Sequence, residues 1–478
     1  MKHTDIIQKL NLEQKCALLS GETVFTTRAL PGKGIPAITL SDGPNGVRKQ
    51  AGAADHLGLN PSVPATCFPT SSATACSWDE KLGEAVGEAL GEEAAAQEVA
   101  VLLGPGLNIQ RSPLCGRDFE YFSEDPILAG RMAAAYVRGI QKNGISACPK
   151  HFAVNSQELR RMASDSVLDE RTLRELYLTG FEIVVKEAKP KTIMTSYNLI
   201  NGTYANENAH LLQDILRKDW GFDGAVVTDW GGSNDHALGV KNGSTLEMPC
   251  PGGDSIRELM KAVQDGKISE ADVDARLDEM LELVLSTHAA VEKAPRTFDA
   301  AAHHKLARRA AAESIVLLRN EGSILPLKPN EKLAVIGDFA ETPRYQGAGS
   351  SAVNALQVDT LLDSIKADDS GITFVGYASG FERQGAADAE KLEEAVALAK
   401  KADTVLLCLG LDELRESEGL DRSDMKLAEN QQQLLAAVAA VNPNVVVLLS
   451  AGAPVETPWA GQCRACLLYT SPSPRDCS

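Results

Sequence analysis

An acidic side chain follows an apolar run at residues 224–231. Ala225, Val226 and Val227 predict a strand buried on both faces, and the glycines at 231 and 232 predict a turn directly after it. In a parallel α/β fold the carboxyl ends of the strands converge on one mouth, where chemistry is placed. Asp229 stands at such an end, where an aspartate is either a catalyst or the cap of the next helix. These residues alone leave both interpretations open.

Polar residues also follow the other apolar runs in the first 250 residues. Carboxylates, cations and an aromatic face are the groups that grip a sugar ring, because they bind its hydroxyls and cover its apolar side. Gly337 and the glycines at 347 and 349 are too loosely spaced for a dinucleotide-binding loop, and no metal-ligand spacing competes. The sequence therefore predicts one pocket, with no metal or organic cofactor, lined by Asp42, Arg117, Lys150, His151, Arg161, Tyr197, Asp229 and Trp230.

The first part of the chain alternates apolar runs with helical segments. Such alternation predicts a parallel sheet with right-handed crossovers, and closure into a (β/α)8-type barrel would gather the strand ends. The expected strands are 37–41, 101–104, 144–148, 192–195 and 225–228, with 244–248 as a further candidate. The expected helices include 79–99, 126–143, 169–188, 209–218 and a closing helix at 270–290.

A second α/β unit follows a segment without periodicity. Strands are expected at 333–337, 372–376, 404–410 and 444–450, and helices at 303–318, 386–401 and 430–441. This pattern predicts a second, doubly wound α/β domain, which the family resemblance described below implies to be an α/β sandwich. The expected organisation is a barrel domain at 1–290, a linker at 291–309, the α/β sandwich domain at 310–467 and an anomalous Ser/Pro-rich tail at 468–478.

The end of the chain departs from this pattern. About four strands precede residue 468, whereas a doubly wound sheet usually has about five or six. We therefore expect the second domain to be cut short and residues 468–478 not to belong to it.

Composition narrows the class and the compartment. A net charge of −18 argues against a nucleic-acid partner, and no segment is long enough to cross a bilayer. The ten cysteines lack a disulfide framework, and Cys463 and Cys466 form a C-x-x-C pair without further ligands nearby. We expect a cytoplasmic protein whose oligomeric state is open, a homo-oligomer being one alternative.

The chain resembles glycoside hydrolase family 3, the β-glucosidase-like group, over residues 10–466. Many separate blocks carry the resemblance in order. They are LSDGPNGVR at 40–48, CGRDFEYFSEDP at 115–126, KHFAVN at 150–155, MTSYN at 194–198, VTDW at 227–230, LLRN at 317–320, QGAGSS at 346–351 and ESEGLDR at 416–422.

The resemblance implies roles for residues in both domains. Asp229 matches the family's nucleophile, and Glu418 matches the acid/base, with Glu416 as the runner-up. KHFAVN lacks the His-Asp pair of the subgroup that cleaves N-acetylglucosaminides, so that chemistry is not expected. The positions matching those that bind the sugar are Asp42, Arg117, Lys150, His151, Arg161, Met194, Tyr197 and Trp230.

Physical chemistry sets further expectations for this site. The nucleophile must be ionised, so nearby cations should lower the pKa of Asp229, whereas burial and the nucleophile's charge should raise that of Glu418. Lys150 and His151 are adjacent, so both reach one sugar only across a bulge or an unusual peptide bond. Simpler alternatives are a turn role for Asp42, core packing for Trp230, and for Arg161 a helical pair with Glu158.

The expected activity is retaining hydrolysis of terminal non-reducing β-D-glucosyl residues through a covalent glycosyl-aspartate. The substrate would be a small-molecule or oligosaccharide β-glycoside. One alternative is a β-xylosidase or α-L-arabinofuranosidase on the same scaffold. The other is a catalytically impaired sugar-binding fragment.

Overall fold

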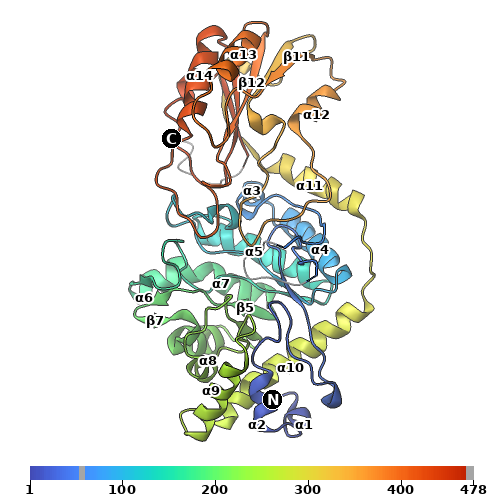
Figure 1. Cartoon of the computed structure of the whole chain (residues 1–478), viewed down its shortest axis with the longest axis vertical. Coiled ribbons are helices and arrows are strands. Elements are labelled where there is room, and N and C mark those ends of the chain that lie inside the picture. The colour runs from blue at the N-terminus through green and yellow to red at the C-terminus, as the bar shows by residue number, and fades with distance from the viewer. Residues whose placement is uncertain (53–59, 470–478) are drawn as a thin grey trace.

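The computed structural model describes residues 1–52 and 60–469, which form two α/β domains (Figure 1). Helix α10 (Glu270–Lys293) ends the first domain, residues 294–299 run along one side of the molecule, and helix α11 (Ala300–Ser314) leads into the second. The predicted linker at 291–309 is therefore wrong in part. Residues 300–309 are helical, because Asp299 caps α11 by accepting a hydrogen bond from the Ala302 N–H.

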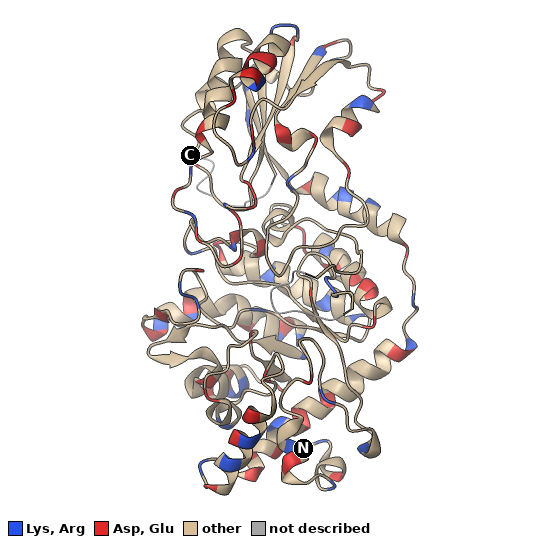
Figure 2. Ribbon diagram, viewed as in Figure 1, with Lys and Arg blue, Asp and Glu red and all other residues tan. Residues whose placement is uncertain are grey.

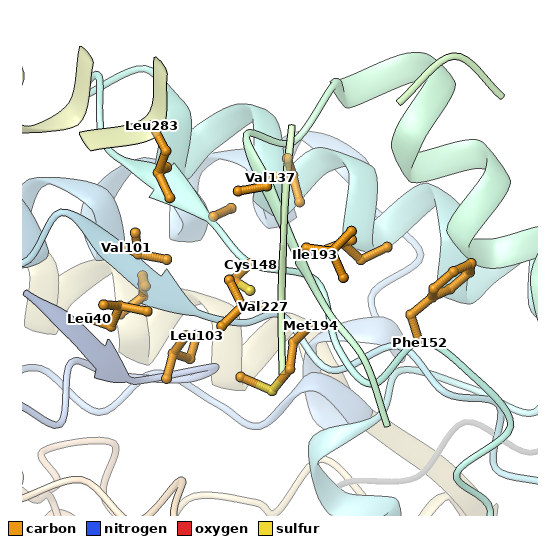
Figure 3. Packing of buried hydrophobic residues seen from close by; sticks show 14 of the residues in the cluster. Leu40, Val101, Leu103, Val137, Cys148, Phe152, Ile193, Met194, Val227 and Leu283 are labelled. Carbon is orange, nitrogen blue, oxygen red and sulfur yellow. The ribbon is translucent and has the colours of Figure 1, made fainter. Parts of the chain in front are cut away.

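Short parallel strands form the centre of the first domain. Strands β1 (Leu40–Asp42), β2 (Val101–Leu103) and β3 (Ser146–Ala147) pair in that order, and β5 (Thr192–Met194) pairs with β8 (Ala225–Val227). Their buried, largely apolar side chains fill the interior, as expected of strands covered on both faces (Figure 3). The predicted barrel-like fold is confirmed.

Single bridges complete the ring around these strands. Leu246 pairs in parallel with Val227, and Glu247 with Ser20. The candidate strand at 244–248 is thus reduced to isolated bridges. Antiparallel bridges from Gly21 to Thr27 and from Thr26 to Thr39 then return the ring to β1. The barrel therefore departs from the all-parallel pattern on one side.

Helices surround this ring. Asp79 and Asp125 cap helices α4 and α5, which pack so closely that a Cβ on Gly87 or Gly139 would meet backbone of the facing helix. The helical segments are α1 (Thr4–Ile7), α2 (Leu12–Ala17), η1 (Pro31–Lys33), α3 (Ser71–Ala75), α4 (Glu80–Ala96), η2 (Asp118–Glu120), α5 (Pro126–Gln141), α6 (Glu170–Thr172), η3 (Leu173–Leu178), α7 (Thr179–Ile183), η4 (Val184–Ala188), η5 (Ala205–Glu207), η6 (His210–Asp219), α8 (His236–Asn242) and α9 (Gly253–Gln264). A small sheet of β4 (Asp165–Ser166), β6 (Leu199–Ile200) and β7 (Thr203–Tyr204) lies outside the ring.

The second domain is a six-stranded sheet of order β11-β10-β12-β13-β14-β9, in which only the β14–β9 pairing is antiparallel. Its strands are β9 (Ile315–Asn320), β10 (Lys332–Ile336), β11 (Thr373–Ala378), β12 (Thr404–Gly410), β13 (Val445–Ser450) and β14 (Ala465–Tyr469). The helical segments are η7 (Glu321–Ser323), η8 (Asp338–Ala340), α12 (Leu361–Lys366), α13 (Ala389–Ala399), α14 (Glu429–Val441) and η9 (Ala460–Gln462).

Two expectations for this domain are wrong. Residues 315–318, predicted as helix, belong to β9, where pairing with β14 overrides the helical pattern of the residues before them. Leu468 and Tyr469, assigned to an unrelated tail, belong to β14, so the estimate of four strands is also wrong. The rest of the predicted tail, 470–478, lies outside the described residues.

A buried ionic contact attaches α11 to the barrel domain. His303 Nδ1 lies 2.7 Å from Glu93 Oε1, and its Nε2 lies 3.3 Å from Glu92 Oε2. Burial lowers the pKa of His303, but these carboxylates outweigh it and raise the pKa above its ordinary value. The contact therefore stabilises the fold fully below the unfolded-state pKa of about 6.5, and the charged part is lost as the pH rises through the folded-state value.

We expect His303→Gln to lower the free energy of unfolding by about 1.5–3 kcal/mol at pH 5.5, the range for hydrogen bonds to charged groups. At pH 9 the loss should be smaller. Denaturant unfolding of both proteins at both pH values measures this, with His288→Gln, at a more exposed pair with Glu292, as the control. An equal loss at both pH values would contradict the assignment.

Candidate active site

A cavity of about 610 Å³ opens where the strand ends of the first domain face loops of the second. Charged residues of both signs lie on the loops between the domains (Figure 2). Every residue predicted for the site lines this cavity, apart from the runner-up Glu416. The lining residues are Asp42, Arg117, Lys150, His151, Arg161, Met194, Tyr197, Asp229, Trp230 and Glu418. It is also lined by residues that the sequence did not single out, namely Phe25, Arg48, Gln50, Met162, Gly349, Ser350 and Ala352.

Asp229 lies directly after β8 with its carboxylate held at one oxygen only. Oδ1 accepts a hydrogen bond from the Trp230 N–H at 2.8 Å. Oδ2 has no hydrogen-bond partner among the described residues and lies 3.7 Å from His151 Nε2. The helix-cap alternative does not apply, since helix α8 begins later and Asp235 caps it. One oxygen of Asp229 is thus free to meet an electrophile.

Glu418 reaches the same cavity from the second domain. Its Oε1 accepts a hydrogen bond from Arg161 Nη1 at 2.9 Å and lies 3.6 Å from Arg117 Nη1. Its Oε2 accepts from the Ser350 N–H at 2.7 Å. Both guanidinium groups belong to the first domain, so Glu418 is held across the domain boundary.

The ionisation of the two carboxyls is opposite to the expectation. Burial raises the pKa of Asp229, and Arg117, Arg161 and Lys150 only partly oppose it. For Glu418, burial acts in the same upward direction, but Arg117, Arg161 and the Ser350 hydrogen bond outweigh it and lower the pKa well below the usual range. The reason is geometric, because the guanidinium groups contact Glu418 and not Asp229.

Lys150 and His151 both line the cavity, and the peptide bond between them is cis, in agreement with the expected unusual peptide bond. Asn108 fixes the backbone of His151 from both sides, accepting from its N–H at 2.7 Å and donating to its carbonyl at 2.8 Å. Burial, followed by the charges of Arg117 and Lys150, lowers the pKa of His151 well below its ordinary value. The imidazole is therefore neutral near pH 7.

Structural contacts accompany the cavity positions of three residues, although Glu158 and Arg161 pair in a turn and not on the helix expected for them. Arg161 pairs with Glu158 at 2.7 Å, yet also contacts Glu418 and stacks on the Tyr197 ring at 4.9 Å. Trp230 donates from Nε1 to the Val24 carbonyl but lines the cavity with Phe25 at a ring distance of 5.3 Å.

Asp42 accepts the Arg48 N–H through its carbonyl, and its carboxylate lies 4.0 Å from Lys150 Nζ. Burial raises the pKa of Asp42 to about 6, against the opposing charge of Lys150. Arg117 is fixed by Glu120 through two hydrogen bonds of 2.9 and 2.8 Å. The i,i+3 spacing of that pair was the available signal for Glu120.

Glu416 lies outside this cavity. Its side chain is buried beside Arg344 and accepts a hydrogen bond from the Gly452 N–H within the second domain. The structure thus places the runner-up away from the other predicted site residues. Glu416 and Glu418, separated only by Ser417, therefore place their side chains in different surroundings.

Other sequence expectations concern metals, thiols and membranes. Within residues 1–52 and 60–469, no cluster of ligating side chains could hold a metal ion, and the cysteines, Cys463 and Cys466 included, are free thiols. None of the helices described is both long and apolar enough to cross a bilayer. The cytoplasmic location stays a prediction.

A barrel-like domain and a sheet domain share a cavity lined by three carboxyl groups and several cationic side chains. Residues 48–283 match the model of the glycosyl hydrolase family 3 N-terminal domain, and residues 315–475 match that of its C-terminal domain. The chain belongs to glycoside hydrolase family 3, which confirms the resemblance.

Named relatives are similar over nearly the whole chain. Thermostable beta-glucosidase B of Acetivibrio thermocellus is 45% identical over 97% of this chain and 61% of its own length. An exo-alpha-(1->6)-L-arabinopyranosidase of Bifidobacterium longum is 44% identical over 96% of this chain and 62% of its own. The crystal structure of a Bifidobacterium adolescentis GH3 beta-glucosidase superimposes with a TM-score of 0.90 at 43% identity, covering 96% of this chain and 66% of that one. The chain thus spans about three fifths of the length of these curated relatives.

Proposed function

We propose that this protein is a retaining β-glucosidase that releases terminal β-D-glucosyl residues. The observation that carries the proposal is the meeting of two carboxyl groups, Asp229 from the first domain and Glu418 from the second, in one cavity lined by hydroxyl-binding cations. The β-glucosidase names of relatives support glucose as the sugar.

In the proposed mechanism, the free Oδ2 of Asp229 attacks the anomeric carbon while Glu418 donates a proton to the leaving oxygen. The glycosyl-aspartate ester is then hydrolysed by water, from which Glu418 takes a proton. Three contacts hold the surroundings of Asp229 in place. The neutral imidazole of His151 lies beside its Oδ2, the Trp230 N–H donates to its Oδ1, and the Tyr197 hydroxyl donates to the Trp230 carbonyl.

The lowered pKa of Glu418 bears on the first step, because a general acid must carry a proton. Arg161 and Arg117 contact Glu418 in the structure. We propose that bound glycoside draws these guanidinium groups onto its hydroxyls. Burial and the charge of Asp229 would then raise the pKa of Glu418, which prepares it to act as the acid.

Turnover of aryl glycosides tests the function and the sugar. We expect kcat/KM for 4-nitrophenyl β-D-glucopyranoside to exceed that for the β-D-xylopyranoside by about 10²-fold or more, because polar groups placed for the missing C6 arm stay unpaired. Asp42, beside Lys150, is the group proposed to bind that arm. Asp42→Ala should therefore lower the ratio of kcat/KM for the glucoside to kcat/KM for the xyloside.

The second candidate is an arabinopyranosidase, favoured by the 44% identity to the Bifidobacterium longum relative. Its sugar also lacks the C6 arm, so faster turnover of 4-nitrophenyl α-L-arabinopyranoside would replace the glucosidase proposal. The β-xylosidase and α-L-arabinofuranosidase alternatives are decided by the corresponding aryl glycosides. Glucose binding by calorimetry with no turnover of any substrate would instead favour the sugar-binding alternative.

A further inference from the structure

We infer that Asp421 and Glu158 form a reciprocal interdomain clasp that positions Glu418 over the cavity. Neither residue is needed to touch the sugar in this role, and Asp421 is not among the residues that line the cavity. The inference rests on the proposed acid/base function of Glu418, and it assigns the two residues as positioning residues.

Asp421 binds three backbone N–H groups of the first domain through its carboxylate. Oδ1 accepts from Glu158 at 2.9 Å and from Gly116 at 3.2 Å. Oδ2 accepts from Leu159 at 2.8 Å and lies 3.1 Å from the Glu158 nitrogen. A carboxylate that accepts several N–H bonds is held more firmly than by neutral contacts, because each bond is charge-assisted.

Glu158 makes the complementary contact from the other domain. Its side chain is buried, and Oε2 accepts from the Gly419 N–H at 2.7 Å and from Arg161 Nη1 at 2.7 Å. Each carboxylate therefore binds backbone on the loop that carries the other. Glu418 precedes Gly419 directly, and Arg161 is its ion-pair partner. The clasp thus fixes both members of the catalytic ion pair.

Close packing of the same loops leaves no freedom beside the clasp. A Cβ built on Gly116 would lie 1.7 Å from the Leu420 carbonyl oxygen and 2.4 Å from that of Ser417. The Arg422 N–H donates to the Leu114 carbonyl at 2.8 Å, which extends the contact on the far side of Asp421.

Within its own domain the loop is attached on both sides of Glu418. Glu418 donates its N–H to the Ala348 carbonyl at 2.9 Å and accepts from the Ser350 N–H at 2.7 Å, and Glu416 contacts Arg344 and the Gly452 N–H. Residues 411–422 contain no helix or strand, and Leu414 and Leu420 are exposed. The contacts with the first domain therefore add to these attachments and fix the loop from the opposite side.

The kinetic test compares substrates that differ in their need for acid. Asp421→Asn keeps the shape but turns an amide toward N–H donors, so we expect kcat/KM for cellobiose to fall by about 10²-fold, as for a displacement of about 1 Å. For 2,4-dinitrophenyl β-glucoside, whose leaving group needs little protonation, kcat/KM should stay within about threefold of the parent.

Two controls separate positioning from general damage. Asp424→Asn changes an exposed carboxylate three residues later that bonds Arg415 within its own domain, and it should behave as the parent. When Glu418 is already replaced by glutamine, adding Asp421→Asn should lower kcat/KM for cellobiose little further, because the acid that Asp421 positions is already absent. Equal losses on both substrates, or a full further loss in the double variant, would overturn the inference.

Hydrogen exchange tests the clasp without turnover. In Asp421→Asn, peptides covering 116 and 158–159 should exchange faster than in the parent and in Asp424→Asn. Gly116→Ala, which pushes the same loop away, should reproduce both the exchange and the leaving-group dependence. Unchanged exchange would overturn the clasp. An inactive parent with faster exchange in the variants would refute the proposed function and leave the clasp standing.

Discussion

Replacing Asp229 by alanine is expected to lower kcat/KM for aryl β-glucosides and cellobiose alike, on the order of 10⁵-fold, as for the loss of a covalent nucleophile in other enzymes. The loss should not depend on the leaving group, since the side chain that attacks the anomeric carbon is gone for every substrate. Initial rates with 4-nitrophenyl β-glucoside and cellobiose measure it.

The matched control is Asp223→Ala, an exposed aspartate that precedes the same strand, β8. It should keep the activity of the parent, and thermal unfolding should show that both variants fold. Mass spectrometry after reaction with a 2-fluoroglucoside, which slows release, should find the sugar attached to Asp229. Activity of Asp229→Ala equal to that of the parent would end the nucleophile assignment.

Replacing Glu418 by alanine is expected to have the second largest effect, and a selective one. For cellobiose, kcat/KM should fall by about 10²- to 10⁴-fold, the usual contribution of a general acid. For 2,4-dinitrophenyl β-glucoside it should change little, although kcat should fall because the glycosyl-aspartate lacks a base for its hydrolysis. Steady-state kinetics over a series of phenol leaving groups gives this dependence directly.

Glu416→Gln is the matched comparison for the acid. Glu416 contacts Arg344 and the Gly452 N–H outside the cavity, so any loss should be shared by all leaving groups. Should Glu416→Gln show the selective loss and Glu418→Ala not, the acid/base role would pass to Glu416 through a rearrangement of the loop.

The elements that the sequence predicts well are those whose local pattern agrees with their tertiary surroundings. The strand at 404–410 is apolar along its whole length and lies inside the sheet, and its bounds are those of β12. Strand β9 was missed because it is half exposed and continues a helical pattern. Strand β14 was missed because a Ser/Pro-rich segment follows it directly.

Site residues that lie within family motifs could be predicted from the sequence, whereas those on loops outside the motifs could not. Asp229 and Glu418 line the same cavity although 189 positions separate them in the sequence. The family motifs indicated this proximity, whereas the periodicity of apolar residues could not. Phe25 and Gln50 come from segments without a chemical pattern. The pKa directions failed because they depend on which carboxylate Arg161 contacts, a matter of distance that spacing along the chain does not give.

The pairing of β9 with β14 has a consequence for biosynthesis. Strand β9 begins the second domain, yet its neighbour in the sheet is made of residues 465–469. During translation, an apolar segment with Ile315 and Leu317 must wait, unpaired, until nearly the whole domain has left the ribosome. Until then the backbone groups of β9 that β14 will pair form an open strand edge, which is the kind of surface that aggregates during folding.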